Sequence, residues 1–178
     1  MKTRTYLAAA VTAALLAPAS AAHAATATCD GLTATIVSGK RVIHGTSGND
    51  VIVVKGTRAH KVYGGAGNDI ICGSAGADLI NGGAGNDVII GNGGKDKLFG
   101  KAGTDALFGG KGIDALYGGA GSDDLDGNDK GDRLAGGSGT DVVHADSADV
   151  LVEAASDDVQ DDSEWLTLTA GEAALKVV

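Results

Sequence analysis

The sequence lacks the short motifs that mark the common classes of enzyme. It contains no GxSxG, no HExxH and no glycine-rich phosphate-binding loop. These motifs carry the nucleophile of many serine hydrolases, the zinc ligands of metalloproteases and the phosphate site of nucleotide-binding proteins. Their absence argues against those activities, and we expect a protein that is not an enzyme.

Positive charge and cysteine are also scarce. Residues 1–24 hold two of the 14 Lys and Arg residues and none of the 23 Asp and Glu residues, so the remainder carries a net charge of −11. Nucleic acids and anionic membranes select basic surfaces, which argues against both as partners and in favour of cations. The 2 cysteines and the scattered histidines show none of the zinc spacings, which argues against a zinc or iron site.

After the N-terminus the chain has no second long apolar segment. Lys2 and Arg4 precede an apolar run at residues 6–16 that is too short to span a bilayer, and residues 22–24 (Ala-His-Ala) supply the small residues of a cleavage site. This pattern is typical of a Sec-type signal peptide over residues 1–24. We therefore expect a secreted, extracellular protein without a transmembrane segment in its mature chain.

What the sequence has in excess is glycine and aspartate at a fixed spacing. Nine blocks of nine residues follow one another from Gly64 to His144, and a tenth, Gly45–Val53, stands apart. Each block begins with glycine and has aspartate at position 6 and Ile, Leu or Val at position 8. A flexible linker would not keep this register, and evenly spaced aspartates are typical of an array of ordered metal sites. The position-6 residues are Asp50, Asp69, Asp78, Asp87, Asp96, Asp105, Asp114, Asp123, Asp132 and Asp141.

The period predicts a coiled chain of turns and short strands. Glycine at positions 1 and 4 suits a turn that needs positive φ and close backbone approach. In a three-residue strand that follows a six-residue turn, position 8 points inward while positions 7 and 9 point outward. Stacked coils would then bury a continuous ladder of Ile and Leu, which no single repeat can bury alone.

The apolar ladder extends upstream of the glycine pattern. Ile43 lies nine residues before Ile52, and Val62 lies nine before Ile71, so one extra residue interrupts the phase between the two pairs. We therefore expect residues 25–63 to form an N-terminal cap and degenerate first coils.

These blocks resemble the RTX, or hemolysin-type, calcium-binding nonapeptide GGxGxDxUx, over about half of the chain. The resemblance implies an all-β fold, a parallel β-roll or β-solenoid in which two nonapeptides form one coil. It also implies Ca²⁺ between turns two repeats apart, held by position-6 carboxylates and turn carbonyls. One row of turns would carry Asp69, Asp87, Asp105, Asp123 and Asp141, and the other Asp78, Asp96, Asp114 and Asp132, which gives about seven interior sites. The glycines that this assignment includes are Gly64, Gly67, Gly82, Gly85, Gly100, Gly103, Gly118 and Gly121.

The donor chemistry points to the same ion independently. Calcium takes six to eight oxygen ligands in flexible geometry, and carboxylates with peptide carbonyls supply such ligands. Departures from the pattern indicate weak points: Lys130 replaces glycine at position 4 of its block, so Asp132 is the least secure ligand. Whether Asp50, in its isolated block, finds a partner turn is left open.

The cysteines and the position-9 side chains predict further contacts. Cys29 and Cys72 are expected to form a disulfide in an exported protein, and closing this loop would contribute about 4 kcal/mol in the loop-entropy description. The bond would hold the N-terminal segment across an outer sheet face. Position 9 also carries four large side chains that would stack in pairs on opposite sheets, Ile90 with Phe108 and Phe99 with Tyr117. They would form either a ladder that stabilises its own sheet or a surface for self-association, glycans or another protein.

The repeat pattern is lost after His144, and residues 145–178 are expected to form an acidic C-terminal cap or a docking tail. The main functional hypothesis is a secreted module, structural or binding, whose folding is coupled to calcium binding. The alternatives are a calcium-dependent adhesin or polysaccharide-binding protein and an accessory subunit of an exported enzyme.

Overall fold

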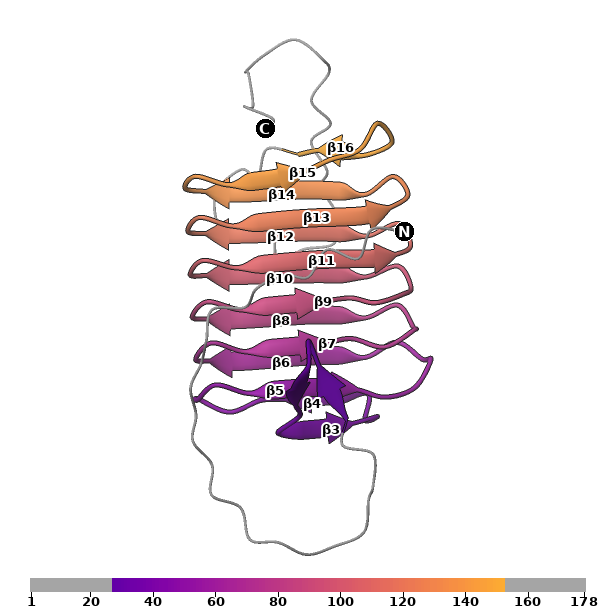
Figure 1. Cartoon of the computed structure of the whole chain (residues 1–178), viewed down its shortest axis with the longest axis vertical. Helices are drawn as coiled ribbons and strands as arrows, with labels where there is room; N and C mark the ends of the chain where they lie inside the picture. The colour runs from indigo at the N-terminus through magenta and orange to yellow at the C-terminus, as the bar shows by residue number, and fades with distance from the viewer. Residues whose placement is uncertain (1–26, 153–178) are drawn as a thin grey trace, which may run out of the picture.

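The chain coils into two parallel β-sheets that face each other across one aliphatic core (Figure 1). The computed structural model describes residues 27–152. The predicted signal peptide and residues 153–178 of the predicted C-terminal segment lie outside the described residues. Within residues 27–152, no helix is long and apolar enough to cross a membrane.

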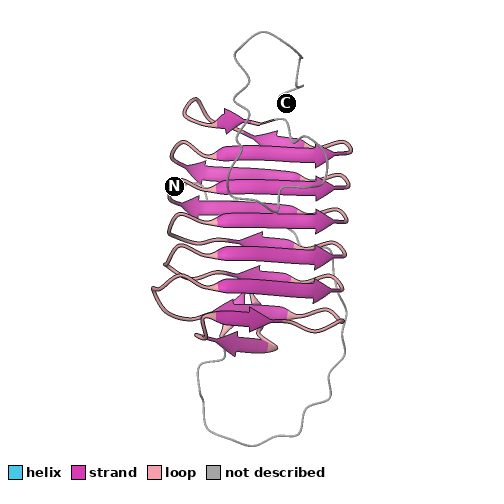
Figure 2. Cartoon of the chain, turned by 180° about the vertical axis from the view of Figure 1, so that it is seen from behind, coloured by secondary structure: helices cyan, strands magenta, loops and turns pink. Residues whose placement is uncertain are grey.

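From β3 onward, the odd-numbered and even-numbered strands build separate sheets of seven strands each. The first sheet contains β3 (Ile36–Ser38), β5 (Val51–Val54), β7 (Ile70–Cys72), β9 (Val88–Ile90), β11 (Ala106–Lys111), β13 (Asp124–Asp129) and β15 (Val142–His144). The second contains β4 (Val42–His44), β6 (Lys61–Ala66), β8 (Leu79–Ala84), β10 (Lys97–Ala102), β12 (Ala115–Ala120), β14 (Arg133–Ser138) and β16 (Val150–Leu151). Seen from behind, the strands of each sheet run in one direction and the turns lie along the two edges (Figure 2).

Strands that pair within a sheet come from alternate repeats. Leu98 pairs with Ile80 on one side and with Leu116 on the other, so the register advances by two nonapeptides per coil. This pairing confirms the predicted β-solenoid. The extra residue upstream also appears in the register, because Ile43 pairs with Val62 and Ile52 with Ile71.

The position-8 side chains form the core, as the period predicted. The side chains from Ile52 to Leu125 in this ladder are completely buried, and Ile43 and Leu134 at its ends are 4% and 1% exposed. Strands from the two sheets contribute alternately, so each coil adds two aliphatic layers. The ladder contains Ile43, Ile52, Val62, Ile71, Ile80, Ile89, Leu98, Leu107, Leu116, Leu125 and Leu134.

The strands are longer than the predicted three residues in many coils. Seven of the described strands, β6, β8 and β10 to β14, have six residues and continue through positions 1 to 3 of the next block. Lys101, for example, pairs with Gly83 and Gly119 beyond the aliphatic positions. Positions 1 to 3 therefore belong to these longer strands, and positions 2 and 3 pair with the same positions of the neighbouring coils.

The predicted disulfide is present and holds the N-terminal hairpin on the outside of the odd-numbered sheet. The hairpin consists of β1 (Thr28–Cys29) and β2 (Leu32–Thr33), which pair in antiparallel fashion. Cys29 is 1% exposed and joins Cys72 with a Cα separation of 5.7 Å. Strand β1 contacts β5 and β7, so the hairpin covers the outer face of the first coils.

The ladder predicts a large cost for truncating one of its members. Leu107→Ala removes a completely buried side chain, so we expect the free energy of unfolding in calcium to fall by about 2–5 kcal/mol. Urea denaturation would measure the change. Ile113→Ala is the matched control, because Ile113 is 51% exposed and its truncation should change stability by less than about 1 kcal/mol. Equal losses in the two variants would contradict the assignment of the core.

Candidate metal centre

The position-6 aspartates stack into two rows along the edges of the roll. Their spacing of two repeats per coil places Asp69 beside Asp87, and the backbone N–H of Asp69 donates to Oδ1 of Asp87 at 2.8 Å. Every neighbouring pair in both rows repeats this hydrogen bond, with distances of 2.7–3.0 Å. The rows are Asp50, Asp69, Asp87, Asp105, Asp123 and Asp141, and Asp78, Asp96, Asp114 and Asp132.

The second carboxylate oxygen of most of these residues is buried without a hydrogen-bond partner. Burying a charged or polar oxygen without compensation is costly, so such atoms in a native structure call for an ion or another partner. Repetition of the same orphaned atom in successive coils points to a repeated ligand. Among residues 27–152, the affected atoms are Oδ2 of Asp69, Asp87, Asp96, Asp105, Asp114, Asp123 and Asp132.

Backbone carbonyls lie next to these orphaned oxygens. A Cβ added to Gly64 would collide with Oδ2 of Asp69 and with the carbonyl oxygen of Gly82 in the next turn of the row. The carbonyl oxygens of Gly65 and Gly67 in turn lie against the glycines of that next turn. Glycine at position 1 therefore keeps open a space into which a carboxylate and carbonyl oxygens point.

The sequence predicted positive φ at positions 1 and 4. In the structure, positive φ occurs at positions 2 and 4 of most blocks. Gly65 and Gly83 at position 2 have φ of 118° and 119°, and Gly67 and Gly85 at position 4 have φ of 101° and 121°. Position 1 needs glycine for the lack of space, whereas position 4 needs it for its positive φ. The predicted glycine roles were thus half correct.

Lys130 does not distort the backbone of its turn. It adopts φ of 100°, and glycine at position 4 also has positive φ in most of the other blocks. Asp132 keeps the common arrangement, since its Oδ1 accepts a hydrogen bond from the N–H of Asp114 at 2.7 Å and its Oδ2 is orphaned. A left-handed conformation is strained for lysine, so the cost falls on the backbone of Lys130 rather than on the carboxylate.

The donor set fits a hard cation. Within the described part of the chain, no three side chains of His, Cys, Asp or Glu come together as a metal site. Any ion between the turns must therefore take many of its ligands from peptide carbonyls, with carboxylate oxygens beside them. An all-oxygen set of this kind suits Ca²⁺ and is poorly suited to zinc or copper.

Burial makes the carboxyl groups of the ion-free roll hard to ionise. It raises the pKa of Asp87 and Asp96 from 3.8 to about 7, and that of Asp69, Asp105 and Asp132 to about 6. The hydrogen bond from the neighbouring backbone lowers each pKa in part, and repulsion between aspartates of the same row raises it further. A bound cation would lower the pKa of these carboxyl groups again, because its positive charge offsets both their desolvation and the repulsion from their neighbours.

The sequence analysis missed Asp149, which extends the second row by one coil. Its Oδ1 accepts a hydrogen bond from the N–H of Asp132 at 2.8 Å, and β16 pairs Leu151 with Leu134. The pattern after His144 is therefore shifted rather than lost. The signal was an aspartate followed two residues later by leucine, at a spacing of 17 instead of 18 residues.

The pKa shifts predict how the metal-free chain responds to pH. The unfolded aspartates have pKa values near 3.9, whereas several folded ones have values of about 6 or 7. The folded state therefore binds more protons between these values, so its stability falls as pH rises from about 4 to about 7. In metal-depleted buffer, we expect more β-structure by circular dichroism at pH 5.5 than at pH 8. A gain of structure on going to pH 8 would contradict the buried, uncompensated carboxylates.

A comparison with protein families agrees with the geometry. The profile of the RTX calcium-binding nonapeptide repeat (4 copies) matches residues 42–53, 61–80, 73–107, 99–129 and 117–149, which together cover more than half of the chain. No curated protein and no solved structure matches it significantly. The chain belongs to the family of RTX calcium-binding nonapeptide repeat proteins.

Proposed function

We propose that this protein is an exported module that folds when it meets calcium outside the cell and then acts as a structural or binding element. The observation that carries the proposal is the set of seven buried carboxylate oxygens without a partner. Each would find its partner in a calcium ion between the turns. Without the ion, each would be a cost to the folded state.

Magnitudes support calcium as the agent of folding. With a dissociation constant of about 0.1 mM, in the weak extracellular range, about 1 mM Ca²⁺ stabilises the folded state by roughly 1.4 kcal/mol per independent site. Seven such sites would contribute about 10 kcal/mol, comparable with the whole stability of an ordinary domain. The conformational entropy of a chain with 30 glycines and the repulsion between its aspartates favour the unfolded state and oppose this stabilisation.

Export supplies the change of conditions that the proposal needs. The Sec-type pattern of residues 1–24 would carry the chain from a cytoplasm poor in calcium to surroundings rich in it. The chain would then cross the membrane unfolded and fold afterwards. The protein recovered from the medium should begin at Ala25 and should resist limited proteolysis in calcium but not in a calcium chelator. Resistance under both conditions would contradict the proposal.

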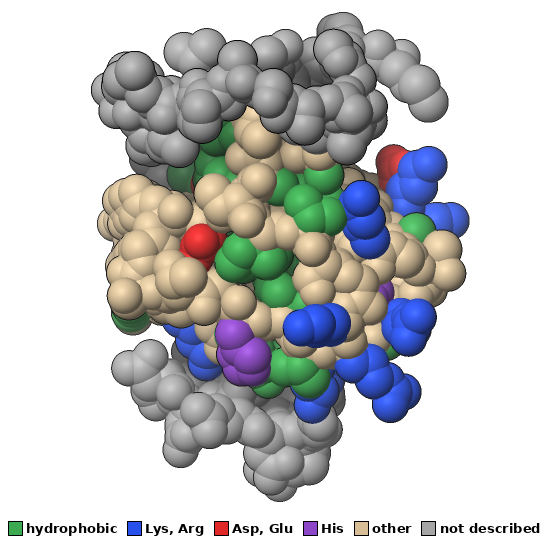
Figure 3. All heavy atoms as spheres, turned by 90° about the horizontal axis from the view of Figure 1, so that it is seen from below, with side chains coloured by type: hydrophobic (Ala, Val, Ile, Leu, Met, Phe, Trp, Pro, Cys, Tyr) green, Lys and Arg blue, Asp and Glu red, His purple; other side chains and the backbone are tan. Residues whose placement is uncertain are grey.

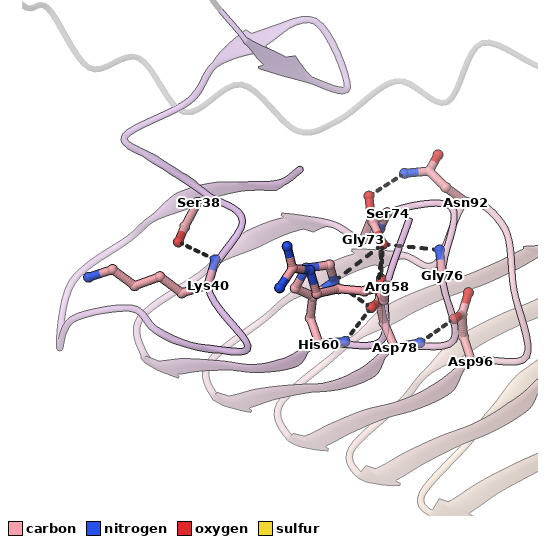
Figure 4. Close-up of polar contacts among 10 residues, drawn as sticks. All are labelled: Ser38, Lys40, Arg58, His60, Gly73, Ser74, Gly76, Asp78, Asn92 and Asp96. Atoms are coloured by element: carbon pink, nitrogen blue, oxygen red, sulfur yellow. Dashed lines mark hydrogen bonds and ion pairs between the residues drawn. The ribbon is translucent and has the colours of Figure 1, made fainter. Parts of the chain in front are cut away.

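The local geometry of one Ser, His and Asp group argues against a catalytic triad at that place. Ser74 Oγ lies 3.4 Å from His60 Nδ1, and Asp78 Oδ1 lies 2.9 Å from the same nitrogen (Figure 4). In a catalytic triad the serine and the aspartate contact opposite nitrogens of the histidine, and the serine is open to substrate. Here all three residues are buried.

A polysaccharide-binding function is the second candidate. Phe99 and Tyr117 stack at 4.8 Å on the outside of one sheet. On the other sheet, a groove of about 670 Å³ has Ile90 and Phe108 in its lining and polar side chains such as Asn128 beside them. Aromatic faces next to amide groups suit sugar rings and their hydroxyls. Glycan-array binding in calcium that disappears in Phe99→Ser plus Phe108→Ser would support this candidate, and unchanged array signals would exclude it.

Substitution of one row member tests the calcium sites directly. Asp87→Asn keeps an oxygen for the N–H of Asp69 but replaces the orphaned oxygen by an amide group, which repels a cation. We expect the calcium concentration at the folding midpoint to rise several-fold, consistent with losing about 1.4 kcal/mol for each impaired site. Calcium titration followed by circular dichroism would measure the midpoint. Asp129→Asn, at an exposed position of β13, is the control and should leave it unchanged; equal shifts in both variants would contradict the assignment.

A further inference from the structure

Two turns near the N-terminus differ in backbone conformation from those that follow. In the turns that begin at Gly45 and Gly73, position 2 is Thr46 or Ser74, and neither residue has positive φ. Position 4 of these turns, Gly48 or Gly76, also lacks positive φ. In the later nonapeptides and in the block at Gly64, position 2 is left-handed, and it is occupied by Gly65, Gly83, Asn92, Lys101, Gly110, Gly119, Asn128 and Gly137.

The hydroxyl residue at position 2 closes each of these two turns on its own aspartate. The N–H and the hydroxyl of Thr46 donate to Oδ2 of Asp50 at 2.7 and 2.9 Å. The N–H and the hydroxyl of Ser74 donate to Oδ2 of Asp78 at the same distances (Figure 4). The oxygen that is orphaned in the later turns therefore has two donors here, and their hydrogens point to where a cation would have to sit.

The other carboxylate oxygen of each residue also has a partner that is not an aspartate. Oδ1 of Asp78 accepts from the N–H of His60 at 2.8 Å and lies 2.9 Å from Nδ1 of the same residue. Oδ1 of Asp50 accepts from the hydroxyl of Thr35 at 3.2 Å. In the later turns this position holds a further aspartate, whereas Asp50 and Asp78 have an aspartate neighbour on one side only, Asp69 and Asp96. A cation would therefore relieve less repulsion at the N-terminal end.

The surface charge of the first coils is the reverse of that of the whole chain. Residues 27–63 contain only two acidic residues, Asp30 and Asp50, against five basic ones. Figure 3, which views the roll from this end, shows Lys and Arg side chains gathered mainly on one side and few acidic ones. Such a field disfavours cations. The basic residues are Lys40, Arg41, Lys55, Arg58 and Lys61.

The same coils have two sources of stability that do not involve a metal. The Cys29–Cys72 disulfide ties the hairpin to β7. The core ladder is built from Ile and Val as far as Ile89 and from Leu beyond it, and β-branched residues favour strands more strongly than Leu does. Both features act before any ion is bound.

We propose that the coils from β3 to Asp78 fold without calcium, because Thr46 and Ser74 take the place of the ion, and that they form the edge on which calcium adds the later coils. This inference rests on the proposed calcium-driven folding of the later coils. It separates two of the ten predicted position-6 ligands, Asp50 and Asp78, which would bind no calcium, from the seven orphaned carboxylates, which would bind it. Of these seven, only Asp69 lies within the coils that would fold first, and its ion would bind after they have formed. Folding would then proceed from the N-terminal end, where strand edges are already formed to pair with.

Hydrogen exchange followed by mass spectrometry tests the proposal on the oxidised mature chain at pH 7.5. In a calcium chelator, we expect amides of residues 36–78 to exchange at least about tenfold more slowly than those of residues 97–144, which should exchange like an unfolded chain. In calcium, both segments should be protected. Fast exchange everywhere in the chelator, with protection everywhere in calcium, would overturn the N-terminal nucleus but leave calcium-driven folding intact. Protection everywhere in the chelator would overturn both.

Variants at position 2 test the mechanism. Thr46→Gly plus Ser74→Gly removes both hydroxyls, and we expect the protection of residues 36–78 in the chelator to be lost and to return in calcium. The matched control, Thr46→Ser plus Ser74→Thr, keeps both hydroxyls and should keep the protection. If the glycine variant retains full protection in the chelator, the hydroxyls do not replace the ion and the proposal is wrong.

Discussion

The structure depends on a buried carboxylate that is only half satisfied by the protein. In most coils, one oxygen of the position-6 aspartate accepts a backbone hydrogen bond from the preceding turn of its row, and the other has no partner. The first oxygen aligns successive turns at a distance of two repeats. The second makes the same alignment unfavourable unless a cation is present. One residue per nonapeptide thus determines both the geometry of the roll and the condition under which it forms.

The other recurring positions of the repeat support the position-6 carboxylate. Glycine at position 1 leaves space for it, as the collision of a Cβ on Gly100 with the carboxylate of Asp105 shows. The aliphatic residue at position 8 buries the inside of the strand that follows, and this burial holds the two rows of turns in register. The core runs through all the coils, but it does not supply the partner that the aspartates need. In the coils with orphaned carboxylates, packing therefore leaves a partner to be supplied, and we propose that this partner is calcium.

Much of this arrangement could be predicted from the sequence because the period is strict. The aliphatic ladder and the stacking of Phe99 on Tyr117 follow from counting positions within the nonapeptide. The two parallel sheets follow from the resemblance to the RTX repeat, and the disulfide from the presence of two cysteines in a chain with a predicted signal peptide. The pattern was less informative where the chain departs from it. Asp149 lies one residue out of phase, and the length of the strands depends on pairing between coils rather than on composition. Ser74 at position 2 carries no signal in the sequence, since only the structure shows that its hydroxyl reaches Asp78.

The central claim is that calcium, and not the sequence alone, brings the roll to its folded state. The most direct measurement is the circular dichroism of the mature chain at neutral pH during titration with Ca²⁺, with Mg²⁺ in parallel. We expect a cooperative gain of β-structure with Ca²⁺ and little change with Mg²⁺, because Mg²⁺ needs near-ideal octahedral geometry and keeps its waters. A spectrum with full β-structure in the absence of calcium, unchanged by either ion, would contradict it.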